Sequence, residues 1–423
     1  MTPTELAPAF FLAVAAILVF CKGVAWLLGK AGQPAVVSEM LAGVLLGPSL
    51  LGLLLPGVEH RLFPAPLLPV LYVVGQVGLV LFMFQAGYAF TGHRITRVAG
   101  TAAAVSVAGV TAPLVLGVLL VVLTDGLAPV RKAGTPLGVT AAFVGVALAI
   151  TAFPMLARII TERGLAGTRH GSLALASGAL DDMAAWIMLA VVLAAASGEP
   201  GPVIVTGGGA AVFALALWLG GRRAGTALMA GDRLGERGRL LGTVALLFLV
   251  AWYTDVIGLY AVFGAFAAGV VMPHTAHADK VVETLTPIAS VVFLPLFFTF
   301  SGLRTEFGLL GDPSVLLFAV ACVVLAVAGK FGACWAAARL RGEPGAVALR
   351  IGALMNARGL MQLIALNVGL EAGIVGPSLF TVLVLVALVT TIMTTPLLTW
   401  IDRRSTVSAS LPERDNHHSP VAP

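Results

Sequence analysis

The sequence predicts an all-α polytopic membrane protein of about 13 transmembrane helices, built as inverted repeats with two crossed broken helices. Three observations predict this fold class: an apolar composition, a succession of helix-length apolar runs, and interrupted runs at matching positions in the two halves. Hydrophobic residues make up 59% of the 423 residues and charged residues 11%, with a mean hydropathy of +1.02. Ordinary soluble domains carry about 25% charged residues. A chain this apolar cannot cover itself with a polar surface, so we expect lipid to be its solvent.

The apolar runs have the length that a bilayer requires, which is about 20 residues in helical form. The first run begins without a preceding Lys or Arg, so we interpret it as a retained helix rather than a signal peptide. The eighth and ninth runs are separated only by a break near Asp255–Gly258, so the number of spans is twelve or thirteen. The runs cover residues 7–28, 36–55, 67–90, 97–123, 136–160, 171–197, 202–219, 240–256, 258–273, 286–302, 313–339, 347–369 and 376–401.

Basic residues are distributed unevenly between the two sides of the predicted membrane. Lys and Arg concentrate in cytoplasmic loops. If the N-terminus is outside, the outer loops hold only Arg61, Arg131, Lys132 and Arg304 of the 25 Lys and Arg residues. This bias predicts a multi-pass protein of the cell (inner or plasma) membrane with a cytoplasmic C-terminus. It also explains the net charge of +5 without nucleic acid, so the lipid bilayer is the expected partner.

The chain is predicted to form one membrane domain, residues 1–401, followed by a disordered cytoplasmic tail, residues 402–423. The longest hydrophilic connection, Gly220–Arg239, is interpreted as a linker between two halves. Three cysteines lie inside apolar runs without the spacing of a disulfide framework or a metal site, so we interpret them as packing residues: Cys21, Cys322 and Cys334.

Three places inside the spans hold ionisable side chains that cannot reach water: Asp181–Asp182, Lys330 and Arg358. Such residues are functional-site candidates because burying them is costly. Counting at 1.5 Å per residue puts Asp181 about 4–5 Å and Lys330 about 6 Å to the cytoplasmic side of the centre. Their similar depth predicts an Asp181–Lys330 pair. A purely stabilising ion pair would explain one aspartate but not the second.

The paired carboxylates indicate competition between protons and cations, because two adjacent carboxylates cannot both ionise easily at low dielectric. A desolvated hard cation needs oxygen ligands, and Asp182 offers them. We therefore predict that Asp182 binds a monovalent cation, and the hydroxyl of Ser177 is a further candidate. The expected transported ions are H⁺ and Na⁺ or K⁺, and no cofactor is expected.

Helix-breaking residues interrupt two spans of opposite direction near their middles, at Thr151–Pro154 and at Asn356–Gly359. Proline removes a backbone donor and frees a carbonyl one turn back. Interrupted spans at matching positions in inverted halves indicate a transporter site, although each one alone also fits an ordinary kink. The predicted crossover residues are Pro154, Asn356, Arg358 and Gly359. Arg358 either satisfies freed carbonyls or belongs to a gate.

Several longer motifs resemble a known family over about residues 8–400, the monovalent cation:proton antiporter-2 family of sodium/proton exchangers. They are Gly32–Pro34, Glu39–Gly43, Leu46–Ser49, Thr151–Arg158, Ala179–Asp182, Ala185–Trp186, Leu294–Phe298, Ser301–Thr305, Gly329–Gly332, Leu354–Leu360, Thr390–Thr391 and Thr394–Pro396. The resemblance implies that Asp182 binds the ion, that Asp181 pairs with Lys330, and that Thr151 and Ala152 form the unwound stretch near the ion.

The resemblance also implies a core domain, about residues 97–197 and 313–401, that moves against a dimerisation domain in a homodimer. Glycines such as Gly43 and Gly269 permit close helix packing, either within the chain or at a dimer interface. One departure is Gln362, which stands where many relatives have Glu.

These features predict a secondary active antiporter that exchanges protons for Na⁺ or K⁺ by alternating access, and not an enzyme. The alternatives are a cation channel and a membrane-embedded enzyme that uses the aspartate pair. Channels tend to use rings of carbonyls or charges. Metal-assisted enzymes need further acidic groups, and no other span holds a second acidic pair.

Overall fold

The protein is all-helical in its computed structural model, which describes residues 3–91, 99–165, 167–197, 200–230 and 235–409. Within these ranges, the β pairing is confined to an isolated bridge between Arg131 and Val375. The α-helices are α1 (Pro3–Gly29), α2 (Ala35–Leu46), α3 (Pro56–Leu62), α4 (Leu68–Thr91), α5 (Ala99–Thr124), α6 (Leu137–Ala149), α7 (Phe153–Glu162), α8 (Arg169–Ser197), α9 (Pro200–Ala216), α10 (Arg222–Met229), α11 (Glu236–Val256), α12 (Ala261–Val271), α13 (Ala276–Ile288), α14 (Leu294–Leu303), α15 (Pro313–Leu340), α16 (Gly345–Met355), α17 (Leu360–Glu371) and α18 (Pro377–Ala409).

Within the described residues, each predicted apolar run contains at least one helix, in agreement with the predicted fold class. Across the described ranges, 9 helical segments are long and apolar enough to cross a membrane. The remaining runs match shorter apolar helices: Val37–Gly52, Leu137–Ala149, Ala261–Val271 and Gly345–Met355. Two of these, Leu137–Ala149 and Gly345–Met355, are the first halves of the interrupted spans. The eleven residues of α12 rise only about 16 Å, so this helix alone does not cross a bilayer core.

The segment interpreted as a linker, Gly220–Arg239, is largely helical in its described part. A π-helical turn over Leu217–Gly221 carries α9 directly into α10, and α11 begins at Glu236. Residues 231–234 of the linker lie outside the described residues. A hydrophilic segment at a membrane edge can be helical because Lys and Arg side chains can lie along a helix while their charged ends reach water.

Helix α18 continues to Ala409, beyond the predicted start of the tail at residue 402. Asp402 accepts a hydrogen bond from Arg350 Nε of α16 at 2.8 Å, and the Arg404 guanidinium lies over the Trp400 ring. These contacts stabilise the last described turns. Residues 410–423 of the predicted tail lie outside the described part of the chain.

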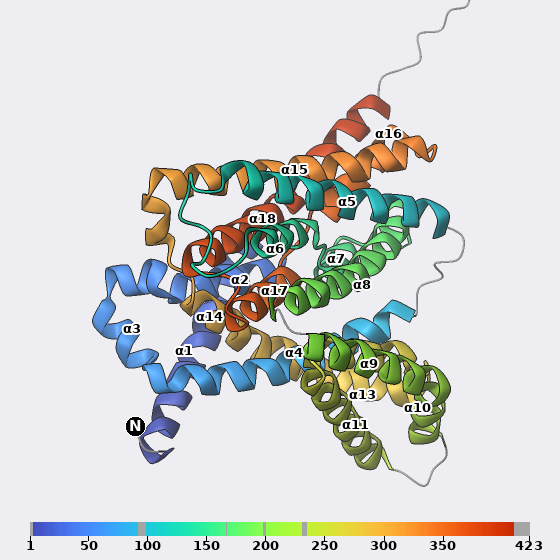
Figure 1. Ribbon diagram of the computed structural model, residues 1–423. Helices are drawn as coiled ribbons and strands as arrows, with labels where there is room; N and C mark the ends of the chain where they lie inside the picture. The colour runs from blue at the N-terminus through green and yellow to red at the C-terminus, as the bar shows by residue number, and fades with distance from the viewer. Residues whose placement is uncertain (1–2, 92–98, 166, 198–199, 231–234, 410–423) are drawn as a thin grey trace, which may run out of the picture.

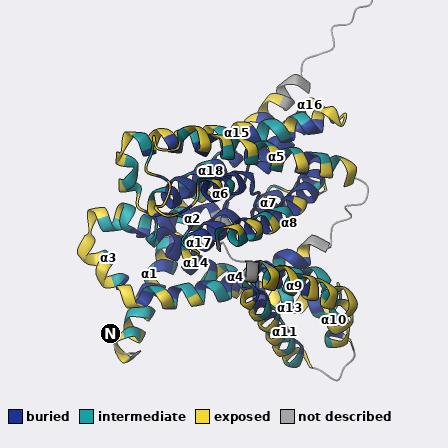
Figure 2. Cartoon of the chain, in the orientation of Figure 1, coloured by how far each residue is buried: buried dark blue, intermediate teal, exposed yellow. Residues whose placement is uncertain are grey.

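Helices far apart in sequence pack into a common bundle. α5 packs against α6, α8 and α15, while α15 also packs against α16 and α18. We call α5–α8 with α15–α18 the broken-helix group; its helices gather in the upper part of Figure 1. We call the remaining helices, α1–α4 and α9–α14, the second group. In it, α4 packs on α12, α2 on α14 and α11 on α12. Buried residues concentrate along α6, α17 and α18, whereas α9–α11 expose most of their surface (Figure 2).

Glycines bring helices of the second group into contact within the chain. A Cβ on Gly43 of α2 would collide with the Phe298 backbone of α14, and one on Gly302 with the backbone of Gly43. On α12, a Cβ at Gly269 would meet the backbone of Phe84 in α4. Of the two roles left open for these glycines, the structure shows intramolecular packing.

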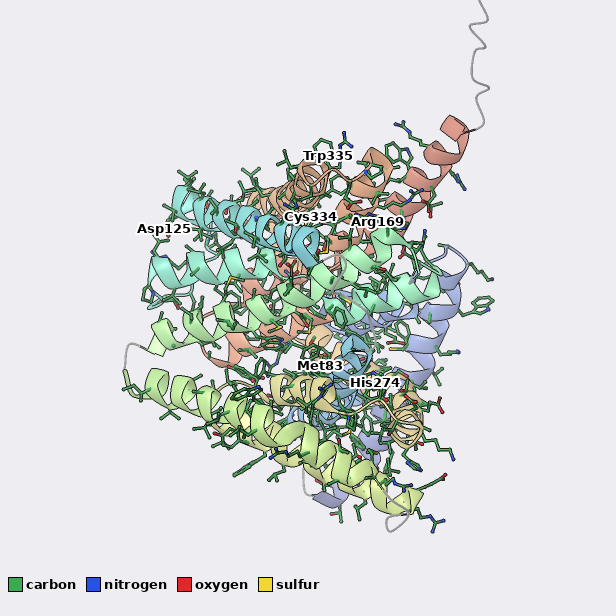
Figure 3. The ribbon with its side chains drawn as sticks, turned by 90° about the vertical axis from the view of Figure 1, so that its right-hand side faces the viewer. Met83, Asp125, Arg169, His274, Cys334 and Trp335 are labelled. Atoms are coloured by element: carbon green, nitrogen blue, oxygen red, sulfur yellow. The ribbon has the colours of Figure 1, made fainter. Side chains whose placement is uncertain are left out.

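The two ends of the bundle are marked by loops of the broken-helix group. Asp125 follows α5 at one end and Arg169 begins α8 at the other, as the side view shows (Figure 3). The interrupted spans run between these ends. Their breaks therefore lie in the interior of the bundle, near the middle of α8 and α15.

Candidate functional site

The two interrupted spans cross at their breaks. α6 ends at Ala149 and α7 begins at Phe153, while α16 ends at Met355 and α17 begins at Leu360. The Ala152 N–H donates to the Ala357 carbonyl at 3.2 Å, which joins the two unwound stretches. Thr151, Ala152, Asn356 and Arg358 are all fully buried there. This brings together the residues that the sequence placed at a crossover.

The proline lies just beyond the break rather than at its centre. Pro154 is in the first turn of α7, and unwinding occurs upstream, at Ile150–Ala152. Proline is well tolerated in a first helical turn because the missing N–H has no intrahelical acceptor there. The residue thus marks the start of the second half-helix, and the prediction placed the interruption within one turn of its observed position.

Gly359 has the backbone conformation that turns the chain into α17. Its φ of 53° and ψ of −125° lie in a region that is almost confined to glycine. Its N–H donates to Thr391 Oγ1 of α18 at 3.0 Å. A buried threonine in α18 therefore fixes the end of the break. The sequence identified the glycine but gave no sign of this partner.

Asp181 and Lys330 form the predicted pair. Lys330 Nζ lies 2.6 Å from Asp181 Oδ2, and both side chains are completely buried. Thr151 Oγ1 donates to the same carboxylate oxygen at 2.7 Å, so the unwound stretch is attached to the pair. Lys330 Nζ also donates to the Ala149 carbonyl at 2.6 Å. That carbonyl ends a half-helix, where the dipole favours a cation.

Asp182 is buried but has no comparable partner. It is 1% exposed, and its Oδ1 atom has no hydrogen bond within the described ranges. Ser177, a further candidate for this site, donates its hydroxyl hydrogen to the Ala102 carbonyl of α5 at 3.1 Å. This hydroxyl therefore already has an acceptor outside the site. A buried polar group without a partner is costly, so its presence suggests a role in binding a proton or an ion.

Arg358 reaches an intact helix rather than the carbonyls freed at the breaks. Its Nη2 donates to the Ala326 carbonyl of α15 at 2.8 Å, and its side chain is fully buried. Its Nε and Nη1 have no partner among the described residues, and the same holds for both amide atoms of Asn356. Two carboxylates, one ammonium and one guanidinium thus share the interior of this bundle.

Gln362, the noted departure, donates its Nε2 to the Leu383 carbonyl of α18 at 3.1 Å. It therefore connects α17 to α18 one turn beyond Gly359. Sequence reasoning missed two further contributors, the carbonyl of Ala149 and the hydroxyl of Thr391. A carbonyl leaves no mark in a sequence. The threonine lies in one of the noted motifs, but nothing there indicated its partner.

Comparisons with known proteins agree with this arrangement. The family described as "Sodium/hydrogen exchanger, transmembrane" matches residues 14–401. The Na⁺/H⁺ antiporter NhaS4 of Synechocystis is 34% identical over 402 residues, covering 91% of this chain and 96% of that protein. The K⁺/H⁺ antiporter 1 of Saccharomyces cerevisiae is 31% identical over 389 residues, which are 86% of this chain and 43% of the yeast protein.

A solved structure shares the fold. The sodium proton antiporter NhaP1 of Methanocaldococcus jannaschii superposes with a TM-score of 0.65 at 16% identity, covering 96% of this chain and 99% of that one. The match shows that the two chains share one fold over nearly their whole lengths. Because the family match spans nearly the whole chain, the resemblance read from the motifs is confirmed as well. This multi-pass membrane protein belongs to the sodium/hydrogen exchanger family.

Proposed function

We propose that the protein is a secondary active antiporter that exchanges protons for Na⁺ or K⁺ by alternating access, with Asp182 as the shared binding group. The observation that carries this proposal is the buried Asp182 carboxylate, whose Oδ1 has no hydrogen-bond partner within the described ranges, next to the Asp181–Lys330 pair and the crossed half-helices. The relatives named as Na⁺/H⁺ and K⁺/H⁺ antiporters support it. They do not agree on the cation, so both ions remain in the proposal.

The coupling follows from the charges at the crossover. Protonation neutralises Asp182, whereas a bound cation compensates its negative charge, so either ligand makes its burial tolerable. The two ligands exclude each other because they use the same oxygens. Asp181 keeps its position through Lys330 and Thr151, and we assign to Thr151 and Ala152 the unwound backbone beside the ion. No resident cofactor takes part in this scheme.

Alternating access requires one group of helices to move against another. We propose that the moving unit is the broken-helix group, about residues 97–197 and 313–401, because it carries the whole crossover. Polar contacts to the second group are local, such as Asn367 Nδ2 to Ser301 Oγ at 2.8 Å and Gln33 Nε2 to the Ile392 carbonyl at 3.0 Å. Contacts of this kind can be exchanged during a cycle.

We further propose a homodimer whose interface lies on the second group, since a surface that moves with the crossover cannot hold two subunits in a fixed relation. The loops that follow α5 and α17 are assigned to the outside, and the start of α8 to the cytoplasm. This assignment rests on the distribution of Lys and Arg. It places the N-terminus outside, and we propose the plasma membrane as the location.

Proton movement in proteoliposomes tests the function directly. The purified protein is reconstituted with a pH-sensitive dye inside, and Na⁺, K⁺ or choline is added to the outside at constant ionic strength. We expect Na⁺ or K⁺ to drive protons in the opposite direction, while choline does not. A cation current without proton movement would indicate a channel instead, and the absence of both would refute transport of these ions.

A further inference from the structure

A small polar cavity lies between the two helix groups, away from the crossover. It has a volume of about 20 Å³, which is room for one water molecule or one small cation. It is bounded by α4, α11, α12 and α14 on one side and by α17 on the other. Its polar lining consists of Tyr72, Gln76, Asp255, Tyr260, Asn367 and Glu371.

One residue of the cavity lining, Asn367, carries a buried oxygen atom without a partner. Asn367 is 3% exposed, and its Nδ2 donates to Ser301 Oγ at 2.8 Å and to the Leu363 carbonyl at 2.9 Å. Because both donors of this amide are engaged, its orientation is fixed. Its Oδ1 has no hydrogen bond in the part of the chain that the structure describes. An amide oxygen held in this way is a ligand for a hard cation.

Two carboxylates make the cavity negative. Glu371 accepts a hydrogen bond from Tyr72 at 3.2 Å and pairs with Arg304 at 3.4 Å, and Asp255 accepts from the Ala261 N–H at 3.3 Å. Two carboxylates against one guanidinium leave one net negative charge. Within the described ranges, three or more His, Cys, Asp or Glu side chains do not cluster as a metal site. The arrangement therefore suits a weakly bound monovalent cation rather than a divalent one.

The backbone beside the cavity is strained. Tyr260 has a φ of 65° and a ψ of 143°, and it is the sole non-glycine residue with positive φ in the described ranges. This conformation costs of order 1–3 kcal/mol and persists where the surroundings impose it, often at functional sites. It places a tyrosine at the start of α12, next to Asp255, where the α11–α12 loop meets the cavity.

An apolar layer separates the cavity from the crossover. Continuing along α8 beyond Asp182, the next turns carry Trp186 and Leu189, and the first turns of α17 carry Met361 and Ala365. These residues line a common small apolar pocket. Asn367 and Glu371 follow on α17, so they lie about 12–18 Å beyond Gly359, counted at 1.5 Å per residue. A cation in the cavity would thus be separated from Asp182 by this apolar layer.

We propose that this cavity is a second, outer cation site, at which Asn367, Glu371 and Asp255 hold a monovalent cation before it passes the apolar layer to Asp182. The proposal rests on the proposed antiport for the identity of the cation. It extends that function because it gives the outer face its own binding step, in the interface between the two helix groups. Opening of this interface would then connect the two sites.

The test measures binding in a protein that does not transport. In the full-length Asp182→Asn variant, Na⁺ or K⁺ should raise the melting temperature relative to choline at constant ionic strength, by about 1–3 °C. A second substitution, Glu371→Gln, should abolish this rise, because it removes one ligand and leaves Arg304 uncompensated. Asn367→Leu should also abolish it. Glu306→Gln is the matched control, since Glu306 is an exposed carboxylate at the same end and outside the cavity lining, and it should leave the rise unchanged.

Arg304→Gln separates binding from structural support. If the Arg304–Glu371 pair only holds the helices together, removing either partner abolishes the rise, and that result would overturn the proposal. If the cavity binds a cation, removing the guanidinium makes it more negative and the rise grows or persists. A cation-independent melting temperature in Asp182→Asn, or a rise that survives Glu371→Gln, would also overturn it.

A sided measurement in the transport-competent protein completes the test. Glu371→Gln should increase the half-saturating cation concentration about threefold to tenfold when the cation is supplied at the face that carries Glu371. The value should be unchanged from the opposite face. Equal effects from both faces would overturn an outer site. If the native protein moves no protons at all, the antiport proposal fails, while the binding measurement above still decides on the cavity.

Discussion

At the scale of single residues, Asp182 and Asp181 are chemically identical neighbours with different surroundings. Each has an Oδ1 atom without a hydrogen-bond partner among the described residues, but Asp181 Oδ2 is held by Lys330 and Thr151, and no ion pair of this kind holds Asp182 there. A carboxylate already neutralised by an ammonium has less to gain from a cation than one that is not. The asymmetry explains why we assign the exchange to Asp182 and the positioning to Asp181.

The first prediction concerns Asp182→Asn. The substitution keeps the shape but removes the charge, so we expect cation-driven proton movement to fall to the level of protein-free vesicles while the protein stays folded. Asp125→Asn is the control, because it removes a carboxylate that forms a half-exposed pair with Arg131 at 3.0 Å. That variant should exchange normally. Near-normal exchange by purified Asp182→Asn would remove this residue from the mechanism.

The second prediction concerns the buried pair. Removing one partner leaves the other buried without compensation, which costs about 3–5 kcal/mol. Asp181→Asn and Lys330→Gln should each lower the melting temperature strongly, and the double variant should lose clearly less than the sum. The missing part corresponds to a coupling of about 1–3 kcal/mol.

The half-exposed pair Arg350–Asp402, at 2.8 Å, supplies the control cycle. Its coupling should be below about 1 kcal/mol, as is usual for pairs near water. Strictly additive losses for Asp181 and Lys330 would mean that the two side chains are not coupled, in spite of their contact.

At the scale of elements, the break before α17 depends on one glycine. The third prediction is that Gly359→Ala destabilises the protein by about 1–3 kcal/mol and reduces exchange, because its φ of 53° and ψ of −125° are strained for any residue with a Cβ. The added Cβ would meet Met155 Cε, a flexible group, so the backbone and not space is the main cost. Melting temperature and proton flux are measured together.

The same interrupted span offers a matched glycine. Gly345 begins α16, has no neighbour within 4 Å of an added Cβ, and has no positive φ. Gly345→Ala should therefore be neutral or slightly stabilising. If the two variants had the same melting temperature and the same proton flux, the backbone conformation of Gly359 would not matter for stability or exchange.

Much of this element scale could be predicted from the sequence, because the bilayer imposes the length and polarity of each span. The positions of Asp181 and Lys330 on two apolar helices were sufficient to predict their contact. The contact between Ala152 N–H and the Ala357 carbonyl could not be predicted, since it joins backbone groups about 200 residues apart. The helical Gly220–Arg223 segment was missed because its polar residues resemble a loop.

At the scale of the whole molecule, the proposed alternating access requires the two helix groups to exchange one set of contacts for another while the crossover carries its ion. The structure places an apolar layer around Trp186 and Met361 on one side of Asp182. In this conformation the layer lies between Asp182 and the end that we propose to be the outer one. If Asp182 binds both ligands, as proposed, proton and cation exclude each other there, and each turn of the cycle carries whichever ligand Asp182 holds.

The last prediction follows from this exclusion. If the cation binds only the deprotonated site, lowering the pH by one unit weakens the apparent cation affinity about tenfold for each proton displaced, since one such step is about 1.36 kcal/mol. The sign is fixed: affinity falls as pH falls, and the dependence flattens at high pH once no proton remains to be displaced. The measurement is the half-saturating cation concentration from mildly acidic to mildly alkaline pH.

Membrane potential then reports how many protons leave. If Lys330 keeps its proton, the site carries the same charge with a proton on Asp182 as with a cation, so one proton moves per cation and the flux ignores the potential. If the incoming cation draws Asp181 away from Lys330, the ammonium loses its counter-ion beside a second positive charge and gives up its proton. Two protons then leave per cation, and the flux responds to the potential. A cation affinity that is constant across the pH range would refute competition as the coupling mechanism in either case.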